Sequence, residues 1–322
     1  MSVPVNAGHA RPLAAVALLI LLLAVLCVPR PAEADLRVTA SIAPLHSLAA
    51  QVMAGAGVPL LLIPAGTSPH GFALSPSQAG MLAEAEVVFW IGGGLESALV
   101  KPITTLAKAA RVIALSRAPG LVRLPVRHLG DDDHGHDHGH DHDHGQGANA
   151  DDPHYWLDPE NAKAILAAIA DTLAAADPAR KDLYGRNAAA ARAGIDALTA
   201  DFKGRLAPLK DRPFIVFHDA YQYLEHRFGL TARGILAIDP DRPAGARHIA
   251  ALRARMVKLN AACLFTEPQF PSRLATALIE GTQARIGVLD PLGTGFPPGP
   301  DLYGSMMTAN LRAFEDCLGG KS

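Results

Sequence analysis

The sequence has few cysteines, little clustered positive charge and few long apolar runs. It contains 3 cysteines, and its 29 Lys+Arg are balanced by 31 Asp+Glu, giving a formal net charge of −2. A nucleic-acid-binding surface requires clustered basic charge. Nucleic acid is therefore not an expected partner, and the scarcity of cysteine excludes a protein held together mainly by disulfides.

One apolar run stands near the N-terminus, at residues 13–28, and no later run is long enough to cross a bilayer. It follows Arg11 and is shorter than the roughly 20 residues that a membrane span needs. An Ala-Glu-Ala pattern then ends at residue 34, as signal-peptidase cleavage requires. We expect residues 1–34 to be a cleaved signal peptide and the mature protein to be soluble in the periplasm. An uncleaved membrane anchor is the alternative.

The positions of the three cysteines fit export. Cys27 lies within the expected signal peptide, and lipid attachment there is disfavoured because the bulky Leu26 occupies a place that usually holds a small residue. Cys263 and Cys317 remain after cleavage. An even pair in an exported protein is best interpreted as one disulfide, with two separate buried thiols as the alternative.

Beyond residue 35 the pattern predicts alternating strands and helices. Continuous apolar strands between helices favour parallel sheets covered on both faces, so the expected fold class is α/β. The 322 residues, of which 49% are hydrophobic, allow two domains, each of roughly 150 residues. The expected strands are residues 36–41, 58–63, 86–91, 111–115, 214–217, 231–238, 262–266 and 285–289.

A long helix is expected between the two series of strands. From residue 178 to 206 apolar residues recur at spacings of three and four, as one face of a helix requires. Such a helix is about 43 Å long, enough to join two lobes. The expected domains are an N-terminal lobe at residues 35–177, which includes a His/Asp-rich loop at 128–153, a linking helix at 178–207 and a C-terminal lobe at 208–322.

Histidine is unusually abundant, and half of the 14 histidines lie between residues 128 and 144. Six of them alternate with Asp and Gly without any aliphatic or aromatic side chain, so this segment cannot form a core. Neutral imidazole binds zinc, copper and nickel, and nearby carboxylates attract cations. We therefore expect an accessory metal-capturing loop, and a low-complexity linker is the alternative. Its histidines are His134, His136, His138, His140, His142 and His144.

Three other side chains follow the expected strands at their carboxyl ends, where open α/β sheets place ligands, and a fourth, His154, opens the segment between the histidine-rich loop and the next helix. His70 and His154 belong to the first lobe, and His218 and Asp290 to the second. The expected site therefore lies between the lobes, a common position for binding sites. Three imidazoles and a carboxylate suit zinc, whereas manganese favours more oxygen ligands. Any one of these histidines alone is more commonly a hydrogen-bonded polar residue.

The segments around these residues resemble the high-affinity zinc-binding periplasmic components of ABC transporters. The resemblance covers essentially the whole mature chain, in the same order. It implies two (β/α) lobes joined by one long helix, zinc in the cleft with His70, His154 and His218 as ligands, and pairing of Cys263 with Cys317. The segments are Ser68–His70, His154–Pro159, Phe217–Tyr221, Phe265–Phe270 and Leu289–Gly293.

One position departs from this family. Several zinc-binding relatives have Glu directly before the first ligand histidine, where this chain has Pro69. The fourth coordination position then goes to Asp290 or to water, and we favour Asp290. Glu267 could orient a ligand or bond to backbone, and we favour the backbone role. Trp156 is expected to pack beside the site.

The expected function is that of a periplasmic zinc-binding component of an ABC-type importer. The protein captures Zn2+ and delivers it to a membrane permease that works with an ATPase. It is expected to be a monomer and not an enzyme, with lobes that move little on binding. The alternatives are an exported zinc-dependent hydrolase, which needs an activated water, a manganese-binding member of the family, and a periplasmic metal buffer without a transporter.

Overall fold

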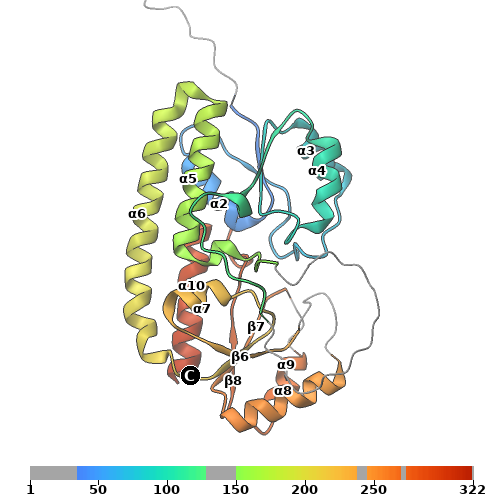
Figure 1. Ribbon diagram of the computed structural model, residues 1–322, viewed down its shortest axis with the longest axis vertical. Coiled ribbons are helices and arrows are strands. Elements are labelled where there is room, and N and C mark those ends of the chain that lie inside the picture. The colour runs from blue at the N-terminus through green and yellow to red at the C-terminus, as the bar shows by residue number, and fades with distance from the viewer. Residues whose placement is uncertain (1–34, 128–149, 238–244, 270–272, 321–322) are drawn as a thin grey trace, which may run out of the picture. The chain divides into compact units, whose positions relative to one another are not determined.

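Two four-stranded parallel sheets with the same strand order form the framework (Figure 1). The computed structural model describes residues 35–127, 150–237, 245–269 and 273–320. The first sheet has the order β2-β1-β3-β4, with β1 (Val38–Ala40), β2 (Leu60–Leu61), β3 (Val87–Trp90) and β4 (Arg111–Ala114). The second has the order β6-β5-β7-β8, with β5 (Phe214–Val216), β6 (Ala232–Ile235), β7 (Cys263–Thr266) and β8 (Arg285–Val288).

All eight strands fall within the expected segments, and the α/β fold class is confirmed. Central strands are buried on both faces, as their continuous apolar sequence requires; Val87, Val88 and Phe89 are fully buried. The second strand is much shorter than expected. It lies at a sheet edge, and Pro59, directly before it, has no N–H to donate to a neighbouring strand.

The helices follow the strands in the expected places. Asp158 caps α5 by accepting a hydrogen bond from the backbone N–H of Glu160, and Pro159 occupies the first helical turn, where its missing N–H costs nothing. The helices are α2 (Ala43–Val52), α3 (Pro76–Glu84), α4 (Val100–Leu106), α5 (Pro159–Ala176), α6 (Lys181–Leu206), α7 (Gln222–Phe228), α8 (Ala246–Leu259), α9 (Arg273–Ile279) and α10 (Leu302–Gly319).

The expected linking helix is present as one 3-10 turn, Pro178–Arg180, followed by α6. Helix α6 packs against α5 and α2 from the first half of the chain and against α10 and α7 from the second (Figure 1). It therefore contacts both halves along its length. Because residues 36–322 cluster into one compact unit, the domain boundaries given above stay a prediction.

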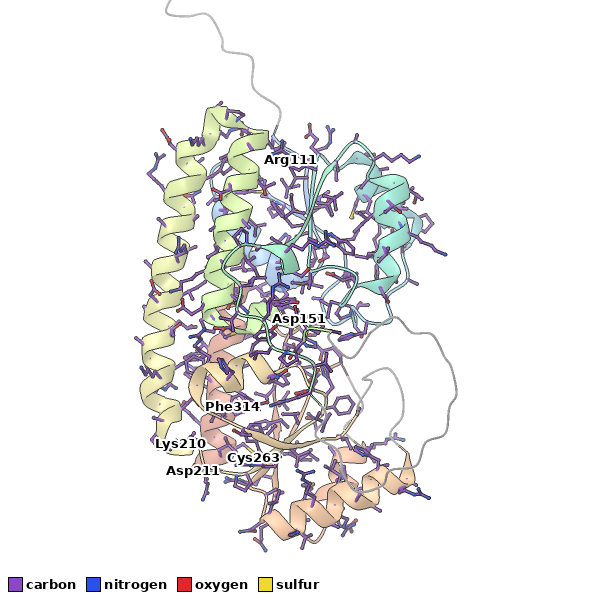
Figure 2. All side chains as sticks on the ribbon, in the orientation of Figure 1. Arg111, Asp151, Lys210, Asp211, Cys263 and Phe314 are labelled. Carbon is purple, nitrogen blue, oxygen red and sulfur yellow. A yellow bond between two sulfur atoms is a disulfide. The ribbon has the colours of Figure 1, made fainter. Side chains whose placement is uncertain are left out.

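The disulfide predicted between Cys263 and Cys317 is present and joins β7 to α10 (Cys263 is labelled in Figure 2). Both cysteines are buried. Phe314 of α10 packs beside this link, with its ring centroid 4.8 Å from that of Phe265 in β7. The C-terminal helix is thus attached to the second sheet by a covalent bond and by aromatic contacts.

Two of the expected features lie outside the described residues: the signal peptide with Cys27, and the six alternating histidines. Among the helices that the structure describes, none combines the length and the apolar character needed to cross a membrane.

Candidate metal site

Three of the four predicted ligands come together. One ring nitrogen each from His70, His154 and His218 lies within 4.8 Å of the other two. The ring centroids are 5.2–5.7 Å apart. The residues come from three segments that are distant in sequence, so the group exists only in the folded chain.

Each histidine is held by a different local structure. His218 lies two residues beyond β5, a central strand that pairs with both β6 and β7. His154 precedes the 3-10 turn Tyr155–Leu157, which leads into α5. His70 lies on the loop between β2 and α3. His154 and His218 are 5% and 6% exposed, whereas His70 is partly exposed, so the site opens to solvent on the side of His70.

Carboxylates orient two of the three rings. Asp152 Oδ1 lies 2.7 Å from His154 Nδ1 and also accepts a hydrogen bond from the His154 backbone N–H. Glu267 Oε1 lies 2.7 Å from His218 Nδ1. Each contact leaves the Nε2 atom for a ligand, and a carboxylate on the other nitrogen is the usual partner of a metal-binding histidine. The backbone role favoured for Glu267 is therefore wrong.

Nε2 of His154 and Nε2 of His218 lie 3.3 Å apart. Two nitrogen ligands of a tetrahedral zinc ion, with Zn–N distances of 2.0–2.1 Å, are separated by about 3.3–3.4 Å. The spacing of His154 and His218 thus fits a shared zinc ion.

The two rings differ in their affinity for protons. Burial lowers the pKa of His154 well below its ordinary value, and the charge of His218 lowers it further. Burial also acts to lower the pKa of His218, but the charge of Glu267 and the hydrogen bond to it outweigh this effect, so the pKa of His218 is raised. When His218 carries a second proton, its Nε2–H is the donor to the Nε2 of neutral His154.

The structure does not bring Asp290 into the group of three histidines. Its carboxylate instead accepts hydrogen bonds from the backbone N–H groups of Leu292, Gly293 and Thr294, and from Gln269 Nε2. An aspartate that organises its own turn in this way is committed to backbone donors, which explains why it lies apart from the histidines.

Among the described residues, hydrogen bonds hold the nitrogen of the Gln269 side-chain amide but not its oxygen. Its Nε2 donates to Asp290 Oδ1 at 3.1 Å and to Thr294 Oγ1 at 2.8 Å. Its Oε1 is buried and has no hydrogen-bond partner among the described residues. Gln269 lines the same cavity as the three histidines, and an unpaired buried acceptor calls for a polar partner.

The cavity between the histidines has a volume of about 20 Å³, which is room for about one water-sized sphere. Trp156 lines it, with its ring 5.4 Å from that of His154. The packing role expected for Trp156 is confirmed, and its Nε1 also donates to the carbonyl of Pro291. A larger groove of about 1470 Å³, between α6, β8 and α10, contains none of the predicted ligands.

Sequence reasoning missed two residues of this site, Asp152 and Gln269. Asp152 stands next to Asp151, after the acidic histidine-rich segment, and looks like part of it; its position two residues before His154 is the available signal. Gln269 lies within the segment Phe265–Phe270 that carries the family resemblance, but no role was predicted for it.

Two parallel α/β lobes in contact with one long helix define the chain as a two-lobed solute-binding protein. A family model described as zinc-uptake complex component A, periplasmic (ZnuA), matches residues 38–317. The chain belongs to this family.

Relatives and solved structures agree with this assignment. A high-affinity zinc uptake system protein ZnuA from Brucella abortus is 43% identical over 304 residues, covering 87% of this chain and 91% of the relative. Its counterpart from Paracoccus denitrificans is 37% identical, covering 90% and 94%. A crystal structure of ZnuA has a TM-score of 0.71 at 25% identity, covering 87% of this chain and 98% of that one.

A further structural neighbour shows the fold alone. The solute-binding protein FpvC from Pseudomonas aeruginosa, solved with Mn2+, has a TM-score of 0.73 at 21% identity, covering 88% of this chain and 99% of that one.

Proposed function

We propose that this protein is the periplasmic zinc-binding component of an ABC-type importer. It captures Zn2+ and delivers it to a membrane permease that is driven by an ATPase. The observation that carries the proposal is the meeting of three imidazoles from three distant segments, two of them oriented by carboxylates. The names of the two curated relatives described above, both high-affinity zinc uptake system proteins, support it.

The chemistry of the donors supports zinc over manganese. The group contains three histidines and no carboxylate, and Mn2+ favours oxygen ligands. The separation of the two Nε2 atoms suits the short Zn–N bonds. A manganese-binding role is therefore the second choice, although a manganese complex occurs among proteins of this fold.

In this proposal the fourth position belongs to water rather than to Asp290. Three nitrogens leave one place open in a tetrahedral zinc site, and Gln269 Oε1 is a buried acceptor in the same cavity. A zinc-bound water that donates to Gln269 would satisfy both requirements. Asp290 then acts indirectly, by fixing the Gln269 amide.

An open position with water is also a property of zinc hydrolases. The small size of the cavity argues against this alternative, because about 20 Å³ is room for about one water-sized sphere and not for an organic substrate. We therefore propose that the protein is not an enzyme.

The six histidines from His134 to His144 are proposed to collect metal for the site without belonging to it. A crystal structure of a ZnuA that lacks residues 138–173 of its own chain is described as having zinc bound. That protein holds zinc without the deleted segment, which supports separate roles. Cleavage after residue 34, a periplasmic location and a monomeric state complete the proposal, and the family description supports the location.

Two measurements test this function together. Competition with a chromogenic chelator should give tight binding of one zinc ion by the mature protein, and manganese should compete poorly. Deletion of the gene should abolish growth and zinc uptake when zinc is scarce, and the wild-type gene should restore both. Tight zinc binding with normal uptake after deletion would favour a metal buffer instead, and weak zinc binding would contradict the proposal altogether.

A further inference from the structure

The described residues on either side of positions 128–149 form a short paired structure, which we call the root (residues 123–127 and 150–152). The backbone N–H of Val126 donates to the carbonyl of Ala150, and that of Asp152 donates to the carbonyl of Leu124. An antiparallel bridge pairs Pro125 with Asp151, which is labelled in Figure 2. The chain thus enters and leaves the histidine-rich segment at one fixed place.

Tyr223, on α7 of the opposite half, bonds to both strands of the root. Its hydroxyl accepts a hydrogen bond from the backbone N–H of Leu124 at 3.1 Å and donates one to the carbonyl of Asp152 at 3.0 Å. Tyr223 is fully buried, and its ring lies 5.4 Å from that of Tyr155. A single hydroxyl therefore spans the pair of strands from the other half of the molecule.

Arg127 forms the second attachment of the root to that half. Its guanidinium donates to both carboxylate oxygens of Asp219, at 2.6–3.0 Å, and to both of Glu225, at 2.7–2.9 Å. Glu225 is 1% exposed. Paired fork contacts of this kind fix orientation as well as distance. The last described residue before the histidine-rich segment is thus held rigidly.

The hydrogen bonds of Tyr223 and of Arg127 both reach a residue that lies beside a candidate ligand. The backbone of Asp152 is held by Tyr223, and its carboxylate holds the ring of His154. Asp219 is held by Arg127 and directly follows His218 in the chain. The root therefore connects the environment of one ligand to that of the other, across the two halves.

We propose that Arg127 and Tyr223 are positioning residues of the metal site. They bind the root to the opposite half and so maintain the spacing of His154 and His218 that zinc requires. This inference rests on the proposed function. Neither side chain touches the metal; both act by setting how long a bound ion is retained.

Tyr223→Phe is the cleanest test, because it removes one oxygen atom and keeps the buried ring. We expect zinc to bind up to about 10-fold more weakly, through faster dissociation, because loss of a direct partner of a ligand costs about 10- to 100-fold and Tyr223 acts on His154 only through Asp152. Tyr184→Phe is the matched control. Tyr184 is also fully buried, and its hydroxyl donates to Asp177, outside the site. Its zinc dissociation rate should equal that of the wild type.

Arg127→Gln tests the second attachment, with Arg205→Gln as control, since Arg205 also bonds to two carboxylates, Asp201 and Glu315, outside the site. Arg127→Lys should restore part of the affinity, because a lysine keeps the charge but not the fork. Combining Tyr223→Phe with Arg127→Lys should cost less than the sum of the single effects, because both act on the same element. If Arg127→Gln does not fold, Tyr223→Phe still decides the question.

Three readouts separate positioning from general stability: the zinc dissociation rate with excess chelator, the visible absorption spectrum of the Co2+-loaded protein, and the unfolding temperature without metal. Faster release and an altered Co2+ spectrum in the root variants alone would support the inference. A lower unfolding temperature with unchanged release and spectrum would overturn it, while tight wild-type binding would leave the proposed function standing. Failure of the wild type itself to bind zinc would overturn both.

Discussion

Nε2 of His154 and Nε2 of His218 lie 3.3 Å apart, although the residues are 64 positions apart in the chain, one before the 3-10 turn that leads into α5 and the other just after β5. Carboxylates on the opposite nitrogens turn both atoms inward. The spacing of the two atoms suits a shared ion, and in the proposed site the more exposed His70 is the third ligand.

Replacing the ligands tests their assignment. His70→Ala, His154→Ala and His218→Ala should each weaken zinc binding by more than about 100-fold, the upper end of the effect of residues that merely orient a ligand. His46→Ala is a control, because His46 is buried and bonds to the carbonyl of Pro59 instead. Isothermal titration with a competing chelator measures the change. Equal losses in the control and in the three variants would show that folding, not ligation, had been disturbed.

Zinc binding should weaken in acid, beginning above pH 6.5. The pKa of His218 is raised from its ordinary value of 6.5, since Glu267 outweighs the lowering by burial. A proton on Nε2 competes with zinc, so affinity should fall about tenfold per pH unit below that raised pKa. The pKa of His154 is lowered, so His154 contributes only in stronger acid. Competition titrations across the range would contradict this if the decline began below pH 6.

Glu267→Gln should lower the zinc affinity at high pH and also shift the acid-induced decline in affinity to lower pH. Removing the carboxylate charge lowers the pKa of His218, so the acid-induced decline should move to lower pH. At high pH the affinity should nevertheless drop by about 10- to 100-fold, because an imidazole without its carboxylate partner is a weaker ligand. The same titrations measure both effects. Glu315→Gln, which alters a carboxylate bound to Arg205, should reproduce the wild-type profile.

Reduction of the disulfide should reduce stability more than binding. Cys263 and Cys317 are separated by 54 positions, for which loss of the cross-link costs about 4 kcal/mol in the chain-entropy treatment. Denaturant unfolding with and without a reductant measures the difference. Zinc affinity at low temperature should change little, because neither cysteine contacts the histidines. A large loss of affinity in a still-folded reduced protein would refute this separation.

Deletion of residues 131–144 should lower the number of zinc ions bound per protein and leave the affinity of the tightest site unchanged. In the proposal the six histidines of this segment collect metal, whereas the three that meet in the cavity hold the tightly bound ion. Metal analysis after dialysis gives the stoichiometry, and chelator competition gives the tight affinity. Loss of the tight site on deletion, with the three histidine substitutions harmless, would reverse the roles assigned to the two groups.

Much of the fold could be predicted from the sequence because its strands are continuous apolar segments between helices. The apolar segment around Val87 predicts only a buried parallel strand. Strand β2, in contrast, lies at a sheet edge, follows Pro59 and contains the exposed Leu60, and it is shorter than expected. The long helix was evident from its apolar stripe, which places Tyr184 and Phe202 in the core.

The site was predictable only in part. His70 and His218 could be predicted because both follow the carboxyl ends of strands, and His154 because it opens the ordered segment after the histidine-rich residues. The position of Asp290 could not be predicted in the same way, because its backbone hydrogen bonds within the turn compete with ligation. The contacts of Tyr223 with Asp152 and of Arg127 with Glu225 join the two halves of the molecule, so nothing local in the sequence reveals them.

Diffraction at the zinc absorption edge, from crystals of the protein with one equivalent of zinc, locates the bound ion. We expect a single strong anomalous peak within bonding distance, about 2.0–2.1 Å, of nitrogens from His70, His154 and His218. A principal peak on the histidines between 134 and 144, or anywhere away from these three rings, would contradict it.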